Sequence, residues 1–320
     1  MYRIADRKGN VREQDSAQDR LLEWMYGHMA GRLLLRPLIS PAVSKLGGRI
    51  LSSGASRLLI RPFVRAGGID MAGYEQGPFR SYNDFFQRKA APGARPVEMA
   101  PECFVSPCDG KVSVSKIDRR SAVQIKHTRY TVERLLRNRK LAELYAGGYL
   151  WVFRLSVEDY HRYIYIDRGV ESKPVRIPGV YHTVNPVAND EVPVYKENTR
   201  EYSLLRTENF GTVLQMEVGA LLVGKIVNHR RGNVVRRGQE KGMFAFGGST
   251  ILRQRQMCIR DRTGILWNIP VRELRRWYVR ERPSAGQRGS VPPDERLRKR
   301  KDRQNGYCFS EEISAYYIVC

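Results

Sequence analysis

The spacing of apolar residues changes once along the chain, near Gly67, and this change limits the folds open to it. Over residues 19–65, leucine, isoleucine and other apolar side chains recur every three or four positions, as on one face of a helix. Pro37, Pro41 and Pro62 interrupt this pattern, and proline cannot continue a helix without losing a hydrogen bond. We therefore expect several short helices before residue 66.

Beyond Gly67 the apolar residues alternate or form short runs, as strands do. Examples are KVSVS at 111–115, YLWVFRL at 149–155 and TVLQMEV at 212–218, separated by turns rich in Gly, Pro and Asn. One helix is expected over 131–144, with Thr131 as its N-cap. The sequence thus predicts an α+β protein, with N-terminal basic amphipathic helices followed by a mainly β core.

The pattern is lost after Ile251, where Leu252 leads into RQRQMCIRDR. Unpaired charges do not enter cores, so no buried strand is expected there. We predict three regions: helices over 1–66, a β core over 67–251 and an irregular, Arg-rich tail over 252–320. The tail is either specific to this lineage or the product of a frameshift, a chimaeric join or an assembly error. We favour the second explanation because all patterning stops at one point.

Composition restricts the partners of the chain. Its 320 residues are 42% hydrophobic, enough for a core, and carry a formal net charge of +23, which indicates an anionic partner: nucleic acid, an acidic membrane or an acidic substrate. No zinc-finger, helix-turn-helix or RNA-binding motif is present, so nucleic acid is not expected. Five cysteines without a C-x-x-C pair argue against a zinc site or a disulfide framework and favour a reducing, cytosolic setting.

The first region resembles a surface that binds lipid. Arginines and lysines are interleaved with its apolar residues, no acidic residue lies between Glu23 and Asp70, and no apolar run is long enough to cross a bilayer. The first fifteen residues lack the apolar segment of a signal peptide. Peripheral contact with an anionic membrane is one interpretation; helices packed on a core with a solvated basic face is the other.

The stretch KGMFAFGGSTILRQ, residues 241–254, holds the candidate nucleophile. Alternating aromatic residues end in Gly247 and Gly248, followed by Ser249 and Thr250. Such a pattern is typical of a strand entering a tight turn. The same bend would also let the Ser249 hydroxyl reach the carbonyl before it.

A base that accepts the proton of this hydroxyl is expected among the histidines. The sequence has five histidines, each of which alone is more typical of a structural or surface residue than of a catalyst: His28, His127, His161, His182 and His229.

Seven stretches, in order, resemble the phosphatidylserine decarboxylase family. They are SYNDFFQRKAAPGARPV (81–97), SPCDGKV (106–112), DYHR (159–162), GVYHTVNP (179–186), ENTREY (197–202), MEVGALLVGKI (216–226) and FGGST (246–250). The resemblance extends from near the N-terminus to about Ile251.

The resemblance implies that the chain processes itself. The family serine, here Ser249, attacks the carbonyl of Gly248, and the resulting ester eliminates to leave a covalent pyruvoyl group. The products would be a β chain of residues 1–248 and an α chain beginning at residue 249, which remain together as a heterodimer. The cofactor would therefore come from Ser249, and no metal is expected.

The resemblance also assigns helpers to Ser249. Asp109 matches the family aspartate that orients a histidine, which takes the hydroxyl proton. The family motif has two histidines, and here the first is His161 whereas Ile164 occupies the place of the second. We assign His161 as the relay base, with His182 and His127 as alternatives.

The implied reaction converts phosphatidylserine to phosphatidylethanolamine. The pyruvoyl carbonyl condenses with the substrate amine to a Schiff base and acts as electron sink, and His161 is the candidate for reprotonating the product. The expected location is peripheral, at the cytoplasmic face of the membrane. Two alternatives are a pyruvoyl-dependent amino-acid decarboxylase and an inactive basic relative that binds membrane or nucleic acid.

Overall fold

The structure is a computed structural model that describes residues 2–5, 11–14, 17–125, 128–229, 233–247, 307–308 and 315–319. It begins with a hairpin of β1 (Tyr2–Ala5) and β2 (Val11–Gln14). The predicted helices follow as short elements: α1 (Ala17–Gly27), α2 (Met29–Leu38), α3 (Pro41–Leu51), the 3-10 helix η1 (Gly54–Leu59) and α4 (Ile60–Gly67).

Prolines mark these helices as expected. Pro37 lies one residue before the end of α2, and Pro41 is the first residue of α3, where its missing N–H costs nothing. The Ser40 hydroxyl caps α3 by accepting from the backbone N–H of Val43. A second 3-10 helix, η2 (Met71–Gly73), and α5 (Tyr82–Phe86) lead into the core.

A large mixed sheet forms the centre of the β core. Its strand order is β14-β9-β11-β12-β17-β7-β4, with β10 also pairing with β11. The bounds are β4 Lys111–Lys116, β7 Tyr149–Arg154, β9 Gly169–Glu171, β10 Val175–Ile177, β11 Arg200–Thr207, β12 Thr212–Val218, β14 Val234–Val235 and β17 Ala315–Val319. The strands expected at 111–115, 149–155 and 212–218 are therefore confirmed.

The strands β7 and β12 of this sheet are buried on both faces, and alternate residues of one strand serve the two sides. In β7, Leu150 and Val152 pack into one apolar cluster, whereas Trp151 and Phe153 pack into another. The first cluster is covered by the hairpin β5 (Ala122–Ile125) and β6 (Thr128–Thr131) and by the helices α6 (Val132–Leu136), α8 (Pro186–Glu191) and α9 (Val194–Glu197).

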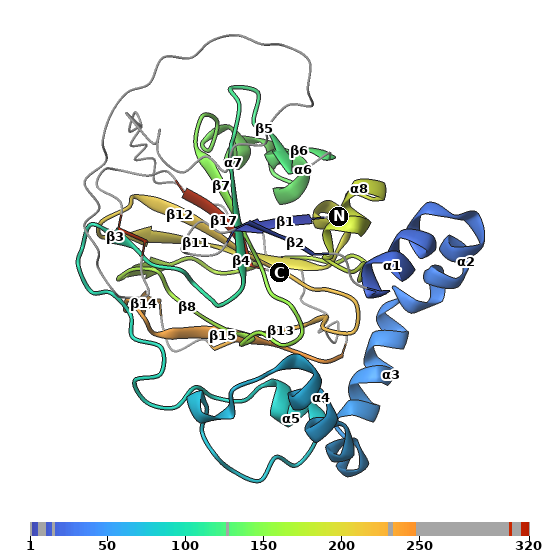
Figure 1. Ribbon diagram of the computed structural model, residues 1–320. Coiled ribbons are helices and arrows are strands. Elements are labelled where there is room, and N and C mark those ends of the chain that lie inside the picture. Colours follow the sequence, from blue (N-terminus) through green and yellow to red (C-terminus); the bar gives the residue numbers. More distant parts are fainter. Residues whose placement is uncertain are drawn as a thin grey trace.

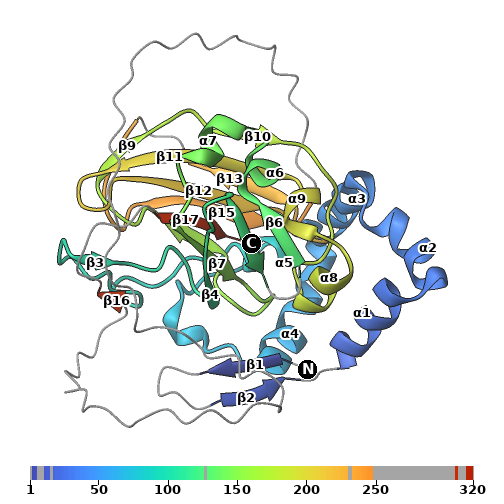
Figure 2. The same ribbon diagram turned by 90° about the horizontal axis from the view of Figure 1, so that it is seen from above.

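The second cluster joins the large sheet to a smaller one below it (Figure 1). The small sheet has the order β13-β15-β8, with bounds Lys225–Asn228, Glu240–Ala245 and Arg162–Ile164. Beneath it lie α4 and α5, which contribute to a third apolar cluster around Phe85, Phe86 and Phe246. Figures 1 and 2 show α1 to α4 along one side of this stack.

The prediction of a single helix over residues 131–144 is wrong. Thr131 is indeed an N-cap, but its helix α6 ends at Leu136, and a second helix, α7, covers Arg139–Glu143. Arg137 has a left-handed backbone with φ of 51°, and the Asn138 side chain caps α7. A residue with positive φ cannot continue a right-handed helix, so the two caps split the predicted element.

Two short strands are described in the tail region. β17 lies between β12 and β7 and runs parallel to both, and β16 (Tyr307–Cys308) pairs with β3 (Cys103–Phe104). Cys103 stands opposite Cys308 in this pair and is disulfide-bonded, which the odd cysteine count did not predict. The rest of 252–320 lies outside the described residues.

Candidate active site

Strand β15 and the two residues that follow it are described as far as Gly247. The predicted cleavage bond comes one residue later, after Gly248. Gly247 has φ of 111°, which an L side chain rarely adopts, so a glycine is needed here. Its N–H donates to the carbonyl of Leu222 at 2.8 Å, and the N–H of Phe246 donates to Asn83 Oδ1 at 3.1 Å. Gly248 and Ser249 themselves lie outside the described residues.

An aromatic stack connects this strand end to His161. The ring of Phe246 lies 4.4 Å from that of Phe86, and Phe86 lies 4.0 Å from the imidazole of His161. The backbone makes the same connection, because the N–H of Phe244 donates to the carbonyl of His161 at 2.9 Å. Ring and backbone contacts thus link His161 to the part of the strand nearest Ser249, between Phe244 and Phe246.

The environment of His161 favours a neutral base. Its Nδ1 lies 2.9 Å from the carbonyl oxygen of Asp159, which can only accept, so Nδ1 carries the proton and Nε2 keeps its lone pair. Burial lowers the pKa of His161 to about 3, and the nearby charge of Arg88 acts in the same direction. No described residue hydrogen-bonds to Nε2.

Asp109 does not contact His161 directly. Its carboxylate accepts from Arg95 at both oxygens, with Nη2 to Oδ2 at 2.8 Å and Nε to Oδ1 at 3.2 Å. Asp109 nevertheless lies near the histidine loop, because its charge helps to raise the pKa of Asp159, after the larger effect of burial. Within the described ranges, the predicted relay from Asp109 to His161 has no hydrogen bond.

Arg88 and Arg95 are neighbours of the site that the sequence did not single out. The Arg88 guanidinium is buried, stacks on the ring of Tyr74 at 4.4 Å and donates through Nη2 to the carbonyls of Glu158 and Asp159. It thus fixes the carbonyl that orients His161. Both arginines belong to the stretch 81–97, so the quoted motif contained them, but its letters gave no reason to prefer them over Lys89.

The alternatives to His161 have other partners. The ring of His182 contacts the Tyr26 hydroxyl at 3.2 Å and Glu197 at 3.5 Å, so both its nitrogens are engaged. His229 pairs with Glu240 at 2.8 Å. His127 lies outside the described residues.

Ile164, at the place of the second family histidine, lies close to the Asp109 loop. Its N–H donates to the carbonyl of Pro107 at 2.8 Å, two residues before Asp109. The aliphatic side chain of Ile164 cannot carry a proton, so this position cannot relay one to Ser249.

A second buried polar cluster lies at the start of β15, between the two sheets. Lys241 Nζ contacts Glu217 Oε1 at 2.7 Å, Ser203 Oγ at 3.0 Å and Glu171 at 3.5 Å. Ser203 and Tyr165 donate in turn to Glu171. Burial raises the pKa of Glu217 to about 7, against the lowering effect of Lys241.

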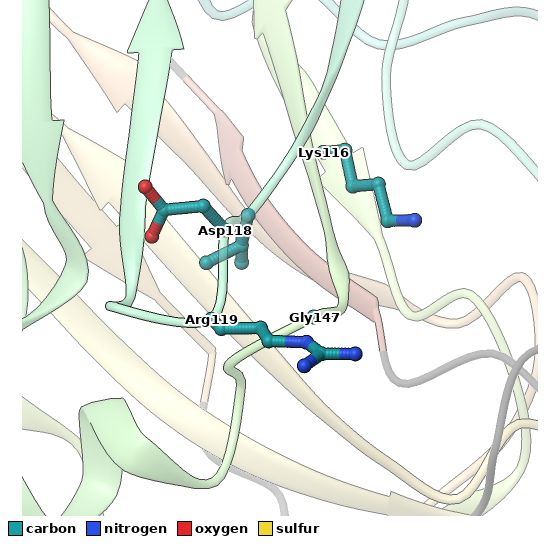
Figure 3. Close-up of a pocket in the computed structure, with 5 residues that line it drawn as sticks. Lys116, Asp118, Arg119 and Gly147 are labelled. Carbon is teal, nitrogen blue, oxygen red and sulfur yellow. The ribbon is translucent and has the colours of Figure 1, made fainter.

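Two surface pockets lie among the described residues, and the second is lined in part by the pair His229 and Glu240. One, of about 420 Å³, is lined by the β4–β5 turn and by Gly147. In Figure 3, Lys116 and Arg119 of this turn lie on the side of Gly147, whereas the Asp118 carboxylate points away from them. The other, of about 550 Å³, includes Tyr160 and Arg162, the neighbours of His161 in the sequence. Neither is lined by Asp109, His161 or Gly247.

Within the described ranges, no group of three or more His, Cys, Asp or Glu side chains could hold a metal ion.

Comparison with known proteins gives the family. A family model described as phosphatidylserine decarboxylase matches residues 82–254, from α5 through the small sheet to just past the predicted cleavage bond. A phosphatidylserine decarboxylase proenzyme 2 from Clostridium acetobutylicum is 44% identical over 232 residues, covering 72% of this chain and 79% of the relative. Proenzymes from Clostridium novyi and Clostridium tetani are 38% and 39% identical, covering 88% and 80% of their own lengths.

The fold and these matches define the protein as an enzyme of the carboxy-lyase class with an α+β fold. The chain belongs to the phosphatidylserine decarboxylase family. The resemblance seen in the seven motifs is thereby confirmed, as are the predicted fold class and enzyme class.

Proposed function

We propose that this chain decarboxylates phosphatidylserine to phosphatidylethanolamine after cutting itself between Gly248 and Ser249. The observation that carries the proposal is the end of β15. There the backbone turns at Gly247, one residue before the proposed bond, and an aromatic stack links the preceding Phe246 to the neutral His161. Family membership and the proenzyme names of the relatives support it.

The processing step uses groups of this chain. The Ser249 hydroxyl gives its proton to Nε2 of His161, and its oxygen attacks the carbonyl carbon of Gly248. The bond from that carbon to the Ser249 nitrogen breaks, and the nitrogen receives the proton, which leaves an ester. The Cα proton of residue 249 is then removed as its Cβ–Oγ bond breaks, which releases Gly248 as a carboxylate. A proton adds at Cβ, and water replaces the nitrogen of residue 249, which leaves as ammonia.

His161 suits this proton transfer through its geometry, because the Asp159 carbonyl holds Nδ1 and leaves the Nε2 lone pair available. Burial lowers the pKa of His161 to about 3, so the ring is unprotonated at neutral pH and, once charged, returns the proton readily. We assign Arg88 and Asp159 as positioning residues, since they hold the ring through the Asp159 carbonyl. We assign Asp109 an electrostatic role through its pair with Arg95 and its proximity to Asp159.

The pyruvoyl group supplies a carbonyl that reacts with the substrate amine and withdraws electrons as carbon dioxide leaves. The described residues next to its predicted position are compatible with a small group of this kind, because a Cβ on Gly247 would meet only the Cα of Gly48 and the carbonyl oxygen of Ser44 within 4 Å. His161 is our candidate for delivering the proton that replaces the carboxylate.

The N-terminal helices are proposed to dock on an anionic membrane. Leu34, Leu46, Ile50 and Leu58 are 56–82% exposed. The helices also carry exposed Arg and Lys, each of which contributes roughly 1 kcal/mol near an acidic surface. No helix in the described ranges is long and apolar enough to cross a bilayer. Binding to phosphatidylserine vesicles that weakens with salt would support docking, and undiminished binding to neutral vesicles at high salt would contradict it.

Intact mass after expression tests the proposal. The wild-type chain should yield two fragments split after Gly248, the second with a blocked N-terminus, whereas Ser249→Ala should remain one chain. Ser53→Ala, which removes an exposed hydroxyl on η1's N-cap, is the matched control and should cleave normally.

The cleaved protein should then release carbon dioxide from phosphatidylserine vesicles. Release from a free amino acid without lipid would instead indicate an amino-acid decarboxylase. A wild-type chain that stays intact and inactive would favour the non-enzymatic binding protein.

A further inference from the structure

Helix α3 presents two different faces. Lys45, Leu46, Arg49 and Ile50 are exposed, whereas Ser44 and Gly48, one turn apart, are buried. The buried face lies against Phe246 and Gly247, at the end of the segment that leads to the proposed cleavage bond. One helix therefore joins the proposed membrane surface to the reacting segment.

The contact at Gly48 is backbone against backbone. A Cβ added at Gly48 would lie 2.5 Å from Cα of Gly247 and 3.0 Å from the carbonyl oxygen of Phe246. Such distances leave no room for any side chain, because the atoms of Gly247 and Phe246 that it would meet belong to the main chain and cannot rotate away. Only glycine at position 48 allows this approach.

A chain of hydrogen bonds holds the same segment from the other end of α3. The Ser52 hydroxyl donates to the carbonyl of Gly48 at 2.6 Å and accepts from Asn83 Nδ2 at 2.9 Å. The Oδ1 of Asn83 accepts from the N–H of Phe246 at 3.1 Å. With Gly247 N–H donating to Leu222, both backbone donors of the segment are fixed before the proposed bond.

The Ser44 hydroxyl lies on the same buried face of α3. Ser44 is fully buried, and its Oγ has no partner among the described residues. Its carbonyl oxygen lies 3.8 Å from the position of a Cβ on Gly247, so the residue borders the segment directly. A buried hydroxyl without a partner costs free energy, and in an active site it is a donor available for the reaction.

We propose that the Ser44–Gly48 face of α3 is a seat for self-cleavage. Gly48 lets the backbone lie on the helix, and the Ser44 hydroxyl donates to the Gly248 carbonyl oxygen as Ser249 attacks it. The negative charge that develops on that oxygen is stabilised by a donor already in place. This inference rests on the proposed self-processing and adds a residue to it.

The first test follows cleavage over time by intact mass. Ser44→Ala should slow cleavage by about 100-fold, as expected for loss of one such donor. Ser44→Cys keeps nearly the same shape but donates weakly, so it should be almost as slow as Ser44→Ala if donation matters, and as fast as wild type if only packing does. Cleavage of both variants at the wild-type rate would overturn the role of Ser44.

Gly48→Ala should also slow cleavage, by displacing Gly247. Its matched control is Gly54→Ala, since a Cβ at Gly54 meets nothing within 4 Å. Thermal unfolding of all four variants checks that the fold is retained.

A second test does not depend on cleavage. In the Ser249→Ala chain, hydrogen exchange at the amides of Phe246 and Gly247 should become at least about tenfold faster when Gly48→Ala is added, and should not change with Gly54→Ala. Unchanged exchange would overturn the seat. A wild-type chain that never cleaves would overturn the proposed function, while the exchange measurement would still decide whether α3 holds this segment.

Discussion

Two buried polar sites flank β15, and they differ in how completely their groups are paired. At the start of the strand, Lys241 contacts two carboxylates and a hydroxyl, and those groups have further partners. At its end, His161 makes one side-chain hydrogen bond, and the nearby Ser44 hydroxyl makes none within the described ranges. Removing one partner at the first site would leave a buried charge uncompensated, whereas the groups at the second keep a lone pair or a proton for reaction.

This difference in pairing predicts that one end of β15 matters for the stability of the fold and the other for the reaction. A paired buried charge is costly to disturb, because its partner is left in a medium of low polarity. An unpaired buried base contributes little to the fold but keeps its lone pair for a substrate. Variants at the two ends of β15 should therefore affect different measurements.

The largest effect is expected at the reactive end. His161→Gln should slow self-cleavage by roughly 10²- to 10⁴-fold, the usual contribution of a general base. Intact mass against time measures it. His229→Gln serves as control, because His229 pairs with Glu240 away from the stack, and it should cleave at the wild-type rate. Equal rates for the two variants would exclude His161 as the base.

At the paired end, Lys241→Met should lower the free energy of unfolding by about 3–5 kcal/mol, because Glu217 and Glu171 lose their cation. Urea denaturation measures this change. The double variant Lys241→Met, Glu217→Leu should recover part of the loss, since the uncompensated carboxylate is gone. Lys225→Met on the exposed edge of β13 is the control and should stay within about 0.5 kcal/mol of wild type.

The pKa of His161 gives a smaller, pH-dependent effect. Its folded pKa of about 3 lies below the ordinary 6.5, so the unfolded chain binds the proton first and stability falls as the pH drops below 6.5. Between pH 6.5 and 5.0 the loss from this residue is about 2 kcal/mol. His161→Gln should remove that part of the slope in urea titrations; an unchanged slope would contradict the buried neutral imidazole.

The smallest effect is expected at the half-exposed pair of Arg95 and Asp109, whose side chains are 29% and 39% exposed. Arg95→Gln should lower the free energy of unfolding by less than about 1 kcal/mol, since solvent screens such a pair. Urea denaturation checks it. A loss as large as that of Lys241→Met would mean that Asp109 is held as tightly as the buried cluster.

The sequence predicted the elements better than the contacts. Apolar runs located β7 and β12, which are buried on both faces, and strict alternation located β4, whose Val112 and Val114 are exposed at the edge of the sheet. Periodicity failed at Arg137, where a left-handed residue splits a helix whose apolar spacing continues on both sides. The periodic pattern carries no information about a single positive φ at a residue other than glycine.

The sequence predicted individual residues of the candidate site, but it did not predict which residues contact one another. A motif identified His161 and Asp109, but their partners, Phe86 and Arg95, come from a different segment of the chain and meet them only in the fold. Ser44 and Gly48 are ordinary residues of an amphipathic helix in the sequence. Their contact with Gly247 spans some two hundred positions, and no local pattern encodes it.

The place of β17 gives the proposed cleavage a mechanical consequence. This strand, downstream of the Gly248–Ser249 bond, is hydrogen-bonded on both edges, to β12 and to β7. Pulling it out would require both ladders to shear at once, since neither edge is free to peel. Cleavage of the backbone would therefore leave both fragments associated. They should separate only when the sheet itself unfolds.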